Sequence, residues 1–131
     1  MKLSQSLSDH ALSAVVDVLI TNSFESVMVT KAGHGTSNTP VVFVNEAFTA
    51  LTGYTAEEVL GKSPTFLQGP ATDRAILDRL RDDLIAGRVF EGRTTNYRKD
   101  GTAFMMHWRV APVTEDDGEP TYYIAVQRSE S

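Results

Sequence analysis

The last third of the chain alternates apolar and polar residues with a period of two, and this alternation constrains the fold more than any other feature. The stretches 89–98, 102–113 and 120–129 each have the pattern of a half-buried β-strand. The turns between them, Lys99-Asp100-Gly101 and Asp116-Asp117-Gly118, supply the glycine that a tight hairpin favours. The sequence therefore predicts a three-stranded antiparallel meander.

The residues before this meander predict two more strands and two short helices. The apolar stretches 25–33 and 40–45 flank a polar loop rich in Gly, Ser and Asn. The first short helix that follows stops at Gly53. Thr55 and Glu58 have the spacing of a capping box, which starts the second helix.

A longer helix is predicted over 72–86, with Gly87 ending it. One side of this helix is apolar and consists of Ile76, Leu77, Leu80, Leu84 and Ile85. The order of elements favours an α+β fold in which a five-stranded antiparallel sheet carries short helices over one face. Such a fold leaves a pocket between the sheet and the helices.

The N-terminal residues 1–24 are predicted to form an amphipathic helical extension to a domain that spans 25–129. Ser8 is a suitable N-cap for this helix. Its apolar positions lie near helical spacing, at Leu3, Leu7, Leu12, Val15, Val16 and Leu19. Packing of this stripe on its own domain is the favoured interpretation, and packing on a second copy of the chain is the alternative.

Composition excludes several classes of function. The 131 residues include no cysteine, which removes disulfides, thiolate catalysis and cysteine-ligated metals. No run of Lys or Arg exceeds two residues, which disfavours nucleic acid and anionic membranes as partners, and the net charge of −5 mainly favours solubility. The three histidines are dispersed, so neither a metal site nor an enzyme is expected. No signal peptide or membrane span is visible, and a cytoplasmic location is expected.

Two stretches, VVFVNEAFTALTGYTAEEVLGKSPTFLQGPATD and NYRKDGTAF, carry a family resemblance. From about Val27 to Gln127 the chain resembles PAS domains, and specifically their light-oxygen-voltage (LOV) branch. This resemblance implies a PAS fold and a sensory role. It also implies a bound flavin, usually FMN, to which a cysteine of the motif GxNCRFLQ forms a light-driven bond.

The stretch that resembles this motif, Gly61 to Gln68, lacks its reactive residue. Ser63 stands at the position of the family's Asn, Pro64 at that of its Cys, and Thr65 at that of its Arg. A cysteinyl adduct is therefore chemically impossible in a chain without a thiol. Ser63 and Pro64 also suit the start of a short helix, as cap and first residue, and this structural interpretation of Pro64 is favoured over a ligand role.

Several positions that resemble flavin contacts are retained. Gln68 and Asn96 match amides of the family, and Gln127 matches the glutamine that contacts flavin O4 and N5. Arg81 matches one of two phosphate-binding arginines. The cofactor-binding residues implied by the resemblance are Met28, Thr30, Ser63, Gln68, Arg81, Asn96, Met106, Trp108 and Gln127.

Other positions weaken the case for flavin. Thr65 removes one phosphate-binding arginine, and Met106 replaces a second asparagine that contacts the ring. Losing such an amide costs about 1–3 kcal/mol when its partner stays unsatisfied. Met106 and Trp108 share one face of their strand. The resemblance implies that this face points inward, so both add bulk to the site, as does Ala125 where the family has glycine.

Three hypotheses follow. The first is a LOV-like sensory domain that binds FMN noncovalently, with Trp108 or a tyrosine as electron donor. The second is a flavin-free dimerisation module with a filled pocket, and the third is a sensor of another small ligand. The expected partners are a second copy of the chain, through the N-terminal helix or the sheet, and a downstream signalling protein.

Overall fold

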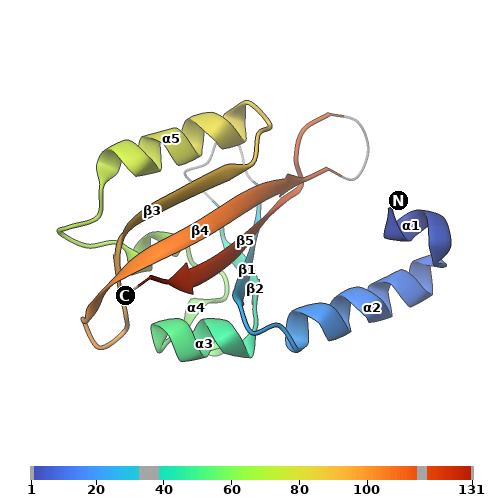
Figure 1. Cartoon of the computed structure of the whole chain (residues 1–131), viewed down its shortest axis with the longest axis horizontal. Helices are drawn as coiled ribbons and strands as arrows, with labels where there is room; N and C mark the ends of the chain where they lie inside the picture. The colour runs from blue at the N-terminus through green and yellow to red at the C-terminus, as the bar shows by residue number, and fades with distance from the viewer. Residues whose placement is uncertain (1, 33–38, 115–117, 131) are drawn as a thin grey trace.

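A five-stranded antiparallel sheet forms the centre of the protein (Figure 1). The computed structural model describes residues 2–32, 39–114 and 118–130. The strands lie side by side in the order β2-β1-β5-β4-β3. Their bounds are β1 Ser26–Lys31, β2 Val41–Val44, β3 Phe90–Tyr97, β4 Ala103–Val113 and β5 Tyr122–Ser129.

The predicted C-terminal meander is confirmed. β4 pairs with β3 on one side and with β5 on the other, so that Trp108 lies opposite both Gly92 and Gln127. The first turn uses Gly101, whose φ of 90° suits glycine. The predicted second turn includes residues 115–117, which lie outside the described part of the chain. β5 continues the sheet by pairing with β1.

Short helices connect the two halves of the sheet, at the places that the sequence predicts. They are α3 Glu46–Thr52, α4 Ala56–Val59, the 3-10 helix η1 Pro64–Leu67 and α5 Arg74–Ile85. Gly53 ends α3 with a φ of 81°, and the capping box of Thr55 and Glu58 is formed. α5 begins later than predicted because Asp73 is its N-cap and accepts a hydrogen bond from the Ala75 amide.

The hydrophobic core lies between the sheet and these helices. Phe48 of α3 and Phe90 of β3 are fully buried. In Figure 1, α5 runs alongside β3 at one edge of the sheet, whereas α3 contacts β1 near the other edge. Inward side chains alternate along β4, where Phe104, Met106, Trp108 and Val110 are all buried.

The N-terminal extension forms two helices, α1 Leu3–Ser6 and α2 Asp9–Thr21. Ser8 caps α2 as predicted, because its hydroxyl accepts a hydrogen bond from the Ala11 amide. The favoured packing of this helix on its own domain is wrong: α2 projects away from the sheet (Figure 1), and none of its residues is buried. The short connection that leads from α2 straight into β1 holds the helix off the sheet.

Asn45 fixes the point where α2 meets the domain. Its Nδ2 donates to the carbonyl oxygens of Ile20 and Glu25, each at 3.0 Å. Its Oδ1 accepts from the amides of Val27 and Phe48. One buried side chain therefore ties the end of α2 to β1 and α3. None of the helices in the described ranges is both long and apolar enough to cross a membrane.

Candidate functional site

A cavity of about 370 Å³ lies between the inner face of the sheet and the helices η1 and α5. Its volume falls in the range of about 300–1,000 Å³ that is typical of small-molecule sites. Most of its wall is apolar, with Leu77, Leu80 and Leu84 contributed by α5. A few polar side chains converge on it from the strands. The predicted pocket between sheet and helices is therefore present.

The cavity brings together all but one of the side chains expected to bind a cofactor. The residues that line it include Met28, Thr30, Pro64, Gln68, Arg81, Asn96, Met106, Trp108 and Gln127. Ser63 is not among the lining residues and is only partly buried. Ser63 immediately precedes η1, and the next residue, Pro64, is the one that lines the cavity.

Pro64 and Ser63 together start η1, but only one of them does so as predicted. Pro64 occupies the first turn, where its missing amide hydrogen costs no helical hydrogen bond. The expected cap by Ser63 is wrong, because its side chain makes no capping hydrogen bond. A single 3-10 turn that begins with proline has few free amides at its start, so a cap has little to satisfy.

Gln127 is a buried polar side chain that lines the cavity and is held by a hydrogen bond from a neighbouring strand. It is 2% exposed and lies on β5, opposite Trp108 of β4. The hydroxyl of Ser26 on β1 donates a 2.9 Å hydrogen bond to its Oε1. Within the described ranges, no residue accepts a hydrogen bond from its Nε2. Gln127 therefore brings an unused donor to the cavity wall.

Asn96 brings an acceptor to the same cavity. Its Nδ2 donates to the carbonyl oxygens of Thr95 (3.1 Å) and Leu67 (3.3 Å), which fixes the amide between β3 and η1. This orientation places Oδ1 beside the sulfur of Met106, which is itself an acceptor and cannot donate a hydrogen bond to it. The side chain is 4% exposed, so a ligand N–H would satisfy an oxygen that has little other compensation.

The bulky side chains expected to crowd the site leave room for a ligand. Met106 and Trp108 are 3% and 5% exposed and point inward, as predicted. Trp108 packs against Phe90, with ring centroids 4.9 Å apart and planes at 57°. Ala125 lines the cavity next to Met28, its paired neighbour on the adjacent strand. The cavity of about 370 Å³ remains beside all of them, so these residues line it rather than fill it.

Two arginines of α5 stand at the cavity rim. Arg81 forms ion pairs with Asp78 (3.6 Å) and Asp82 (3.8 Å) and is 54% exposed. Arg74 was missed by the sequence interpretation, although it precedes Arg81 by seven residues and so shares its face of the helix. Arg74 donates a 3.4 Å hydrogen bond to Oε1 of Gln68, another residue of the site.

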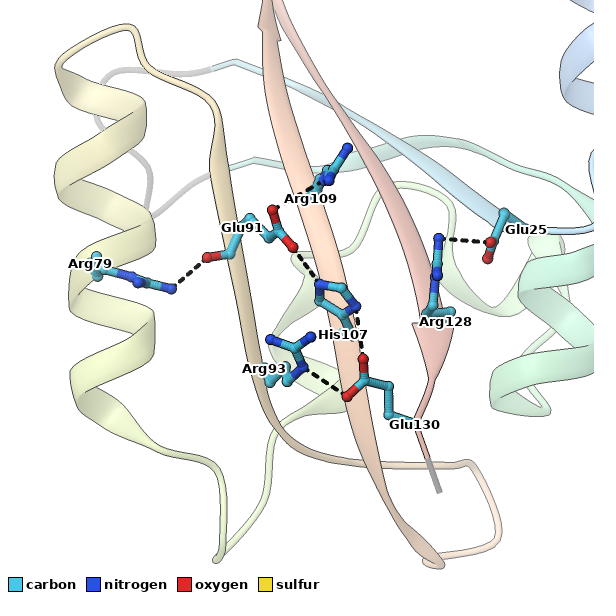
Figure 2. Close-up of polar contacts among 8 residues, drawn as sticks. All are labelled: Glu25, Arg79, Glu91, Arg93, His107, Arg109, Arg128 and Glu130. Atoms are coloured by element: carbon cyan, nitrogen blue, oxygen red, sulfur yellow. Dashed lines mark hydrogen bonds and ion pairs between the residues drawn. The ribbon is translucent and has the colours of Figure 1, made fainter.

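The opposite face of the sheet carries a charged network instead of a cavity (Figure 2). His107 of β4 lies between the carboxylates of Glu91 (2.7 Å) and Glu130 (3.0 Å) and is 13% exposed, so it is far more covered than an ordinary surface histidine. The His107 hydrogen bond and the charge of Arg109 lower the pKa of Glu91. The Arg93 hydrogen bond lowers the pKa of Glu130. This network joins β3, β4 and the end of β5.

Within the described residues, no group of three or more His, Asp or Glu side chains has the geometry to hold a metal ion. The His34 of the sequence lies outside these residues. The inner cavity is lined by three amides, a tryptophan, a tyrosine and the rim arginines. Such a set can orient and hydrogen-bond a flat aromatic ligand with polar edges, and it can hold an anionic group at the rim.

Comparison with known proteins adds to this geometry. Residues 25–131 match the family model described as PAS domain. Phototropin-2 of Oryza sativa subsp. japonica is 42% identical over 88 residues, which cover 67% of this chain and 10% of that protein. The chain thus spans about a tenth of the length of that relative.

Two solved structures have the same fold. The first, described by the words "Flavin Analogue Sheds Light on Light-Oxygen-Voltage Domain Mechanism", has a TM-score of 0.80 and 31% identity and covers 90% of this chain and 85% of that one. The second is the LOV domain from the blue-light activated histidine kinase of Erythrobacter litoralis EL346. It has a TM-score of 0.74 and 30% identity, and covers 80% of this chain and 94% of that one.

Proposed function

We propose that this chain, which belongs to the PAS domain family and has LOV domains of blue-light photoreceptors among its relatives, is a sensory domain that binds a flavin noncovalently. The ligand that fits best is FMN. Because the chain has no cysteine, the domain cannot form a cysteinyl adduct, and any response to light has to proceed without one.

The observation that carries this proposal is the pairing of an unused donor with an under-used acceptor inside one cavity. Nε2 of Gln127 lacks an acceptor among the described residues, and Oδ1 of Asn96 has only the sulfur of Met106 nearby. An isoalloxazine ring offers carbonyl oxygens and an N–H along one edge. Binding such a ring would give both amides a directed hydrogen-bond partner.

A bound flavin supplies the chemistry of light absorption and electron acceptance. Trp108 is the residue placed to donate an electron, since it lines the cavity and its indole is among the most readily oxidised side chains. A change in the hydrogen-bonding edge of the ligand would favour a rotated amide of Gln127. Because Ser26 holds this amide from β1, such a rotation would also affect the strand that follows α2.

Titration of the apo-protein with FMN tests the proposal. The chain has a single tryptophan, and it lines the cavity, so its fluorescence reports on occupancy. We expect FMN to quench Trp108 with saturation at one equivalent, and Asn96→Leu to weaken the binding about ten- to hundredfold, at about 1.4 kcal/mol per decade. The proposal is wrong if a large excess of FMN leaves the fluorescence unchanged.

A second function, dimerisation, is favoured by the uncovered face of α2. Val18 and Leu19 are each 60% exposed although both are strongly apolar. The outer face of the sheet also exposes Met105, Val113 and Val126. We propose that a second copy of the chain covers these apolar surfaces, since burying them against each other removes both from water.

Light scattering of a Val18→Glu/Leu19→Glu variant tests the dimer. We expect the native chain to be a dimer and this variant a monomer, because two buried charges would oppose association. Ser13→Glu, on an already polar and exposed position of α2, is the matched control. A native chain that stays monomeric at high concentration would contradict the dimer without affecting the flavin proposal.

As a sensory module, the domain would pass its signal to a downstream signalling protein and perform no catalysis of its own. A cytoplasmic location, expected from the sequence, belongs to the same proposal. The network around His107 and Glu130 lies where β5 ends, so that a partner at this end of the sheet would meet a surface of paired charges (Figure 2).

A further inference from the structure

We propose that Arg74 binds the phosphate of the flavin ligand and so makes the cavity selective for a phosphorylated flavin. This inference rests on the proposed function, and it assigns the preference for a phosphorylated over an unphosphorylated flavin to the guanidinium of Arg74. The sequence comparison with the LOV motif leaves one phosphate-binding position empty, at Thr65. Arg74 restores a guanidinium to the same rim from a different element, α5.

Arg74 lies where the inner cavity meets a neighbouring recess. It lines both the inner cavity and a neighbouring polar recess, and Thr65 and Gln68 line both of them too. These three residues therefore surround the passage from the inner cavity to the surface. A flavin whose ring contacts Asn96 and Gln127 at the sheet would extend its polar side chain through this passage.

Arg74 also carries a positive charge that no carboxylate within the described ranges compensates. Within the described part of the chain, Arg74 forms no ion pair, and its one hydrogen bond goes to the neutral amide of Gln68. Arg81 instead shares its charge with Asp78 and Asp82. An anion at the rim would therefore gain more from Arg74 than from Arg81.

The remaining groups at the rim are compatible with this role. Thr65 is exposed and lines both recesses, so its hydroxyl can donate one further hydrogen bond to a phosphate oxygen there. Asp78 also lines the cavity and opposes an anion there, although Arg81 pairs with it. Removing the charge of Asp78 should therefore strengthen phosphate binding and release Arg81 to take part in it.

The test compares FMN with riboflavin, which has the same ring and no phosphate. Affinities are measured by Trp108 fluorescence for the native chain, Arg74→Gln, Arg74→Lys and Arg88→Gln. Arg88 follows α5, pairs with Asp83 and does not line the cavity, so it controls for a general loss of positive charge. Thermal unfolding of each variant checks that the fold is retained.

We expect the native chain to prefer FMN over riboflavin, and Arg74→Gln to weaken FMN binding about ten- to hundredfold while riboflavin binding stays unchanged. Arg74→Lys should recover part of the preference, and Arg88→Gln should keep all of it. Asp78→Asn should strengthen FMN binding alone. Added salt should weaken FMN binding more than riboflavin binding, because the phosphate contact lies at the solvent-exposed rim.

Equal affinity for FMN and riboflavin in the native chain, or an equal loss for both ligands in Arg74→Gln, would overturn the inference while leaving a flavin site in place. Failure of both ligands to bind would overturn the proposed function and this inference with it. The two failures are therefore distinguishable in one set of titrations.

Discussion

Ser26 and Gln127 share a buried hydrogen bond of 2.9 Å that joins β1 to β5. Ser26 is the first residue of β1, four residues after the C-cap of α2, and Gln127 lies on the cavity wall. The bond therefore connects the side chain that would contact a ligand to the segment that carries the N-terminal helix. Asn45 strengthens this connection by holding Ile20 and Val27 at the same junction.

Gln127→Leu tests the contact between this glutamine and the flavin. We expect the blue absorption band of the bound flavin to shift to shorter wavelength, because the ring loses a hydrogen-bond donor that stabilises its excited state. Ser26→Ala should give a smaller shift, since it only releases the amide from its anchor. Absorption spectra of the three reconstituted proteins measure this, and identical spectra would remove Gln127 from the ligand contact.

Pro64→Cys tests whether the flavin lies in the position that the family resemblance implies. Pro64 lines the cavity, and a cysteine at the start of η1 would place its thiol there without loss of a helical hydrogen bond. We expect blue light to bleach the flavin band of this variant and the band to recover in the dark. Pro64→Ser, which has no thiol, is the control. A yellow Pro64→Cys protein that never bleaches would place the ring elsewhere.

Trp108→Phe tests the assigned electron donor. We expect the fluorescence lifetime of the bound flavin to lengthen, because the variant removes the proposed electron transfer from Trp108, which would shorten it. The lost packing against Phe90 should lower the free energy of unfolding by about 1–3 kcal/mol. Tyr54→Phe changes an aromatic residue that packs against Phe66 and does not line the cavity, and it should leave the lifetime unchanged. An unchanged lifetime in Trp108→Phe would shift the donor role to Tyr123.

Gly69→Ala tests the packing between the loop after η1 and the sheet. A methyl group on Gly69 would overlap the ring of Tyr97, and the hydroxyl of Tyr97 is held by a hydrogen bond from the Ala71 amide. We expect the free energy of unfolding to fall by about 1–3 kcal/mol, as for other overpacked sites. Urea unfolding measures this loss. The same change in a Tyr97→Ala background should cost less, and equal losses in both backgrounds would show that Tyr97 is not the obstacle.

Glu58 and Lys99 make the stability of the fold depend on pH. The hydrogen bond from Lys99 and that from the Thr55 amide lower the pKa of Glu58 from 4.5 to about 2. A lowered pKa stabilises the folded state above pH 4.5, and this contribution is lost as the pH falls toward 2. NMR titration of the Glu58 carboxyl group measures the pKa directly.

Glu58→Gln should remove this part of the pH dependence, and Glu57→Gln, at a neighbouring carboxylate outside the ion pair, should retain it. A Glu58 that titrates at its ordinary value would show that the ion pair with Lys99 does not persist in solution.

The sequence predicted most of the fold because local signals and period agree along the chain. The alternation of apolar and polar residues predicted the meander. Gly53 predicted the end of one helix, and the capping box of Thr55 and Glu58 predicted the start of the next. The fate of α2 could not be predicted in this way. An apolar stripe predicts that one side of a helix will be buried, but it does not identify the surface that covers it. In this structure the helix's own domain does not cover the stripe.

Five residues of the site were predicted from alternation along the strands together with the family resemblance: Met28, Asn96, Met106, Trp108 and Gln127. Gln68 and Arg81 lie outside the strands and were predicted from the resemblance alone. Whether Met106 and Trp108 fill the pocket depends on rotamers and on the distance between sheet and helices, which no period encodes. Arg74 was missed because the comparison was made position by position, although its spacing from Arg81 placed both on one face of α5.

The visible absorption spectrum of protein purified in the dark tests the central claim most directly. A flavin held between Asn96 and Gln127 should give a structured band in the blue, and heat denaturation should release FMN in about equal amount to the protein. A colourless protein whose spectrum remains that of its separate components after incubation with excess FMN would contradict the account, and would leave dimerisation through α2 as the function of the domain.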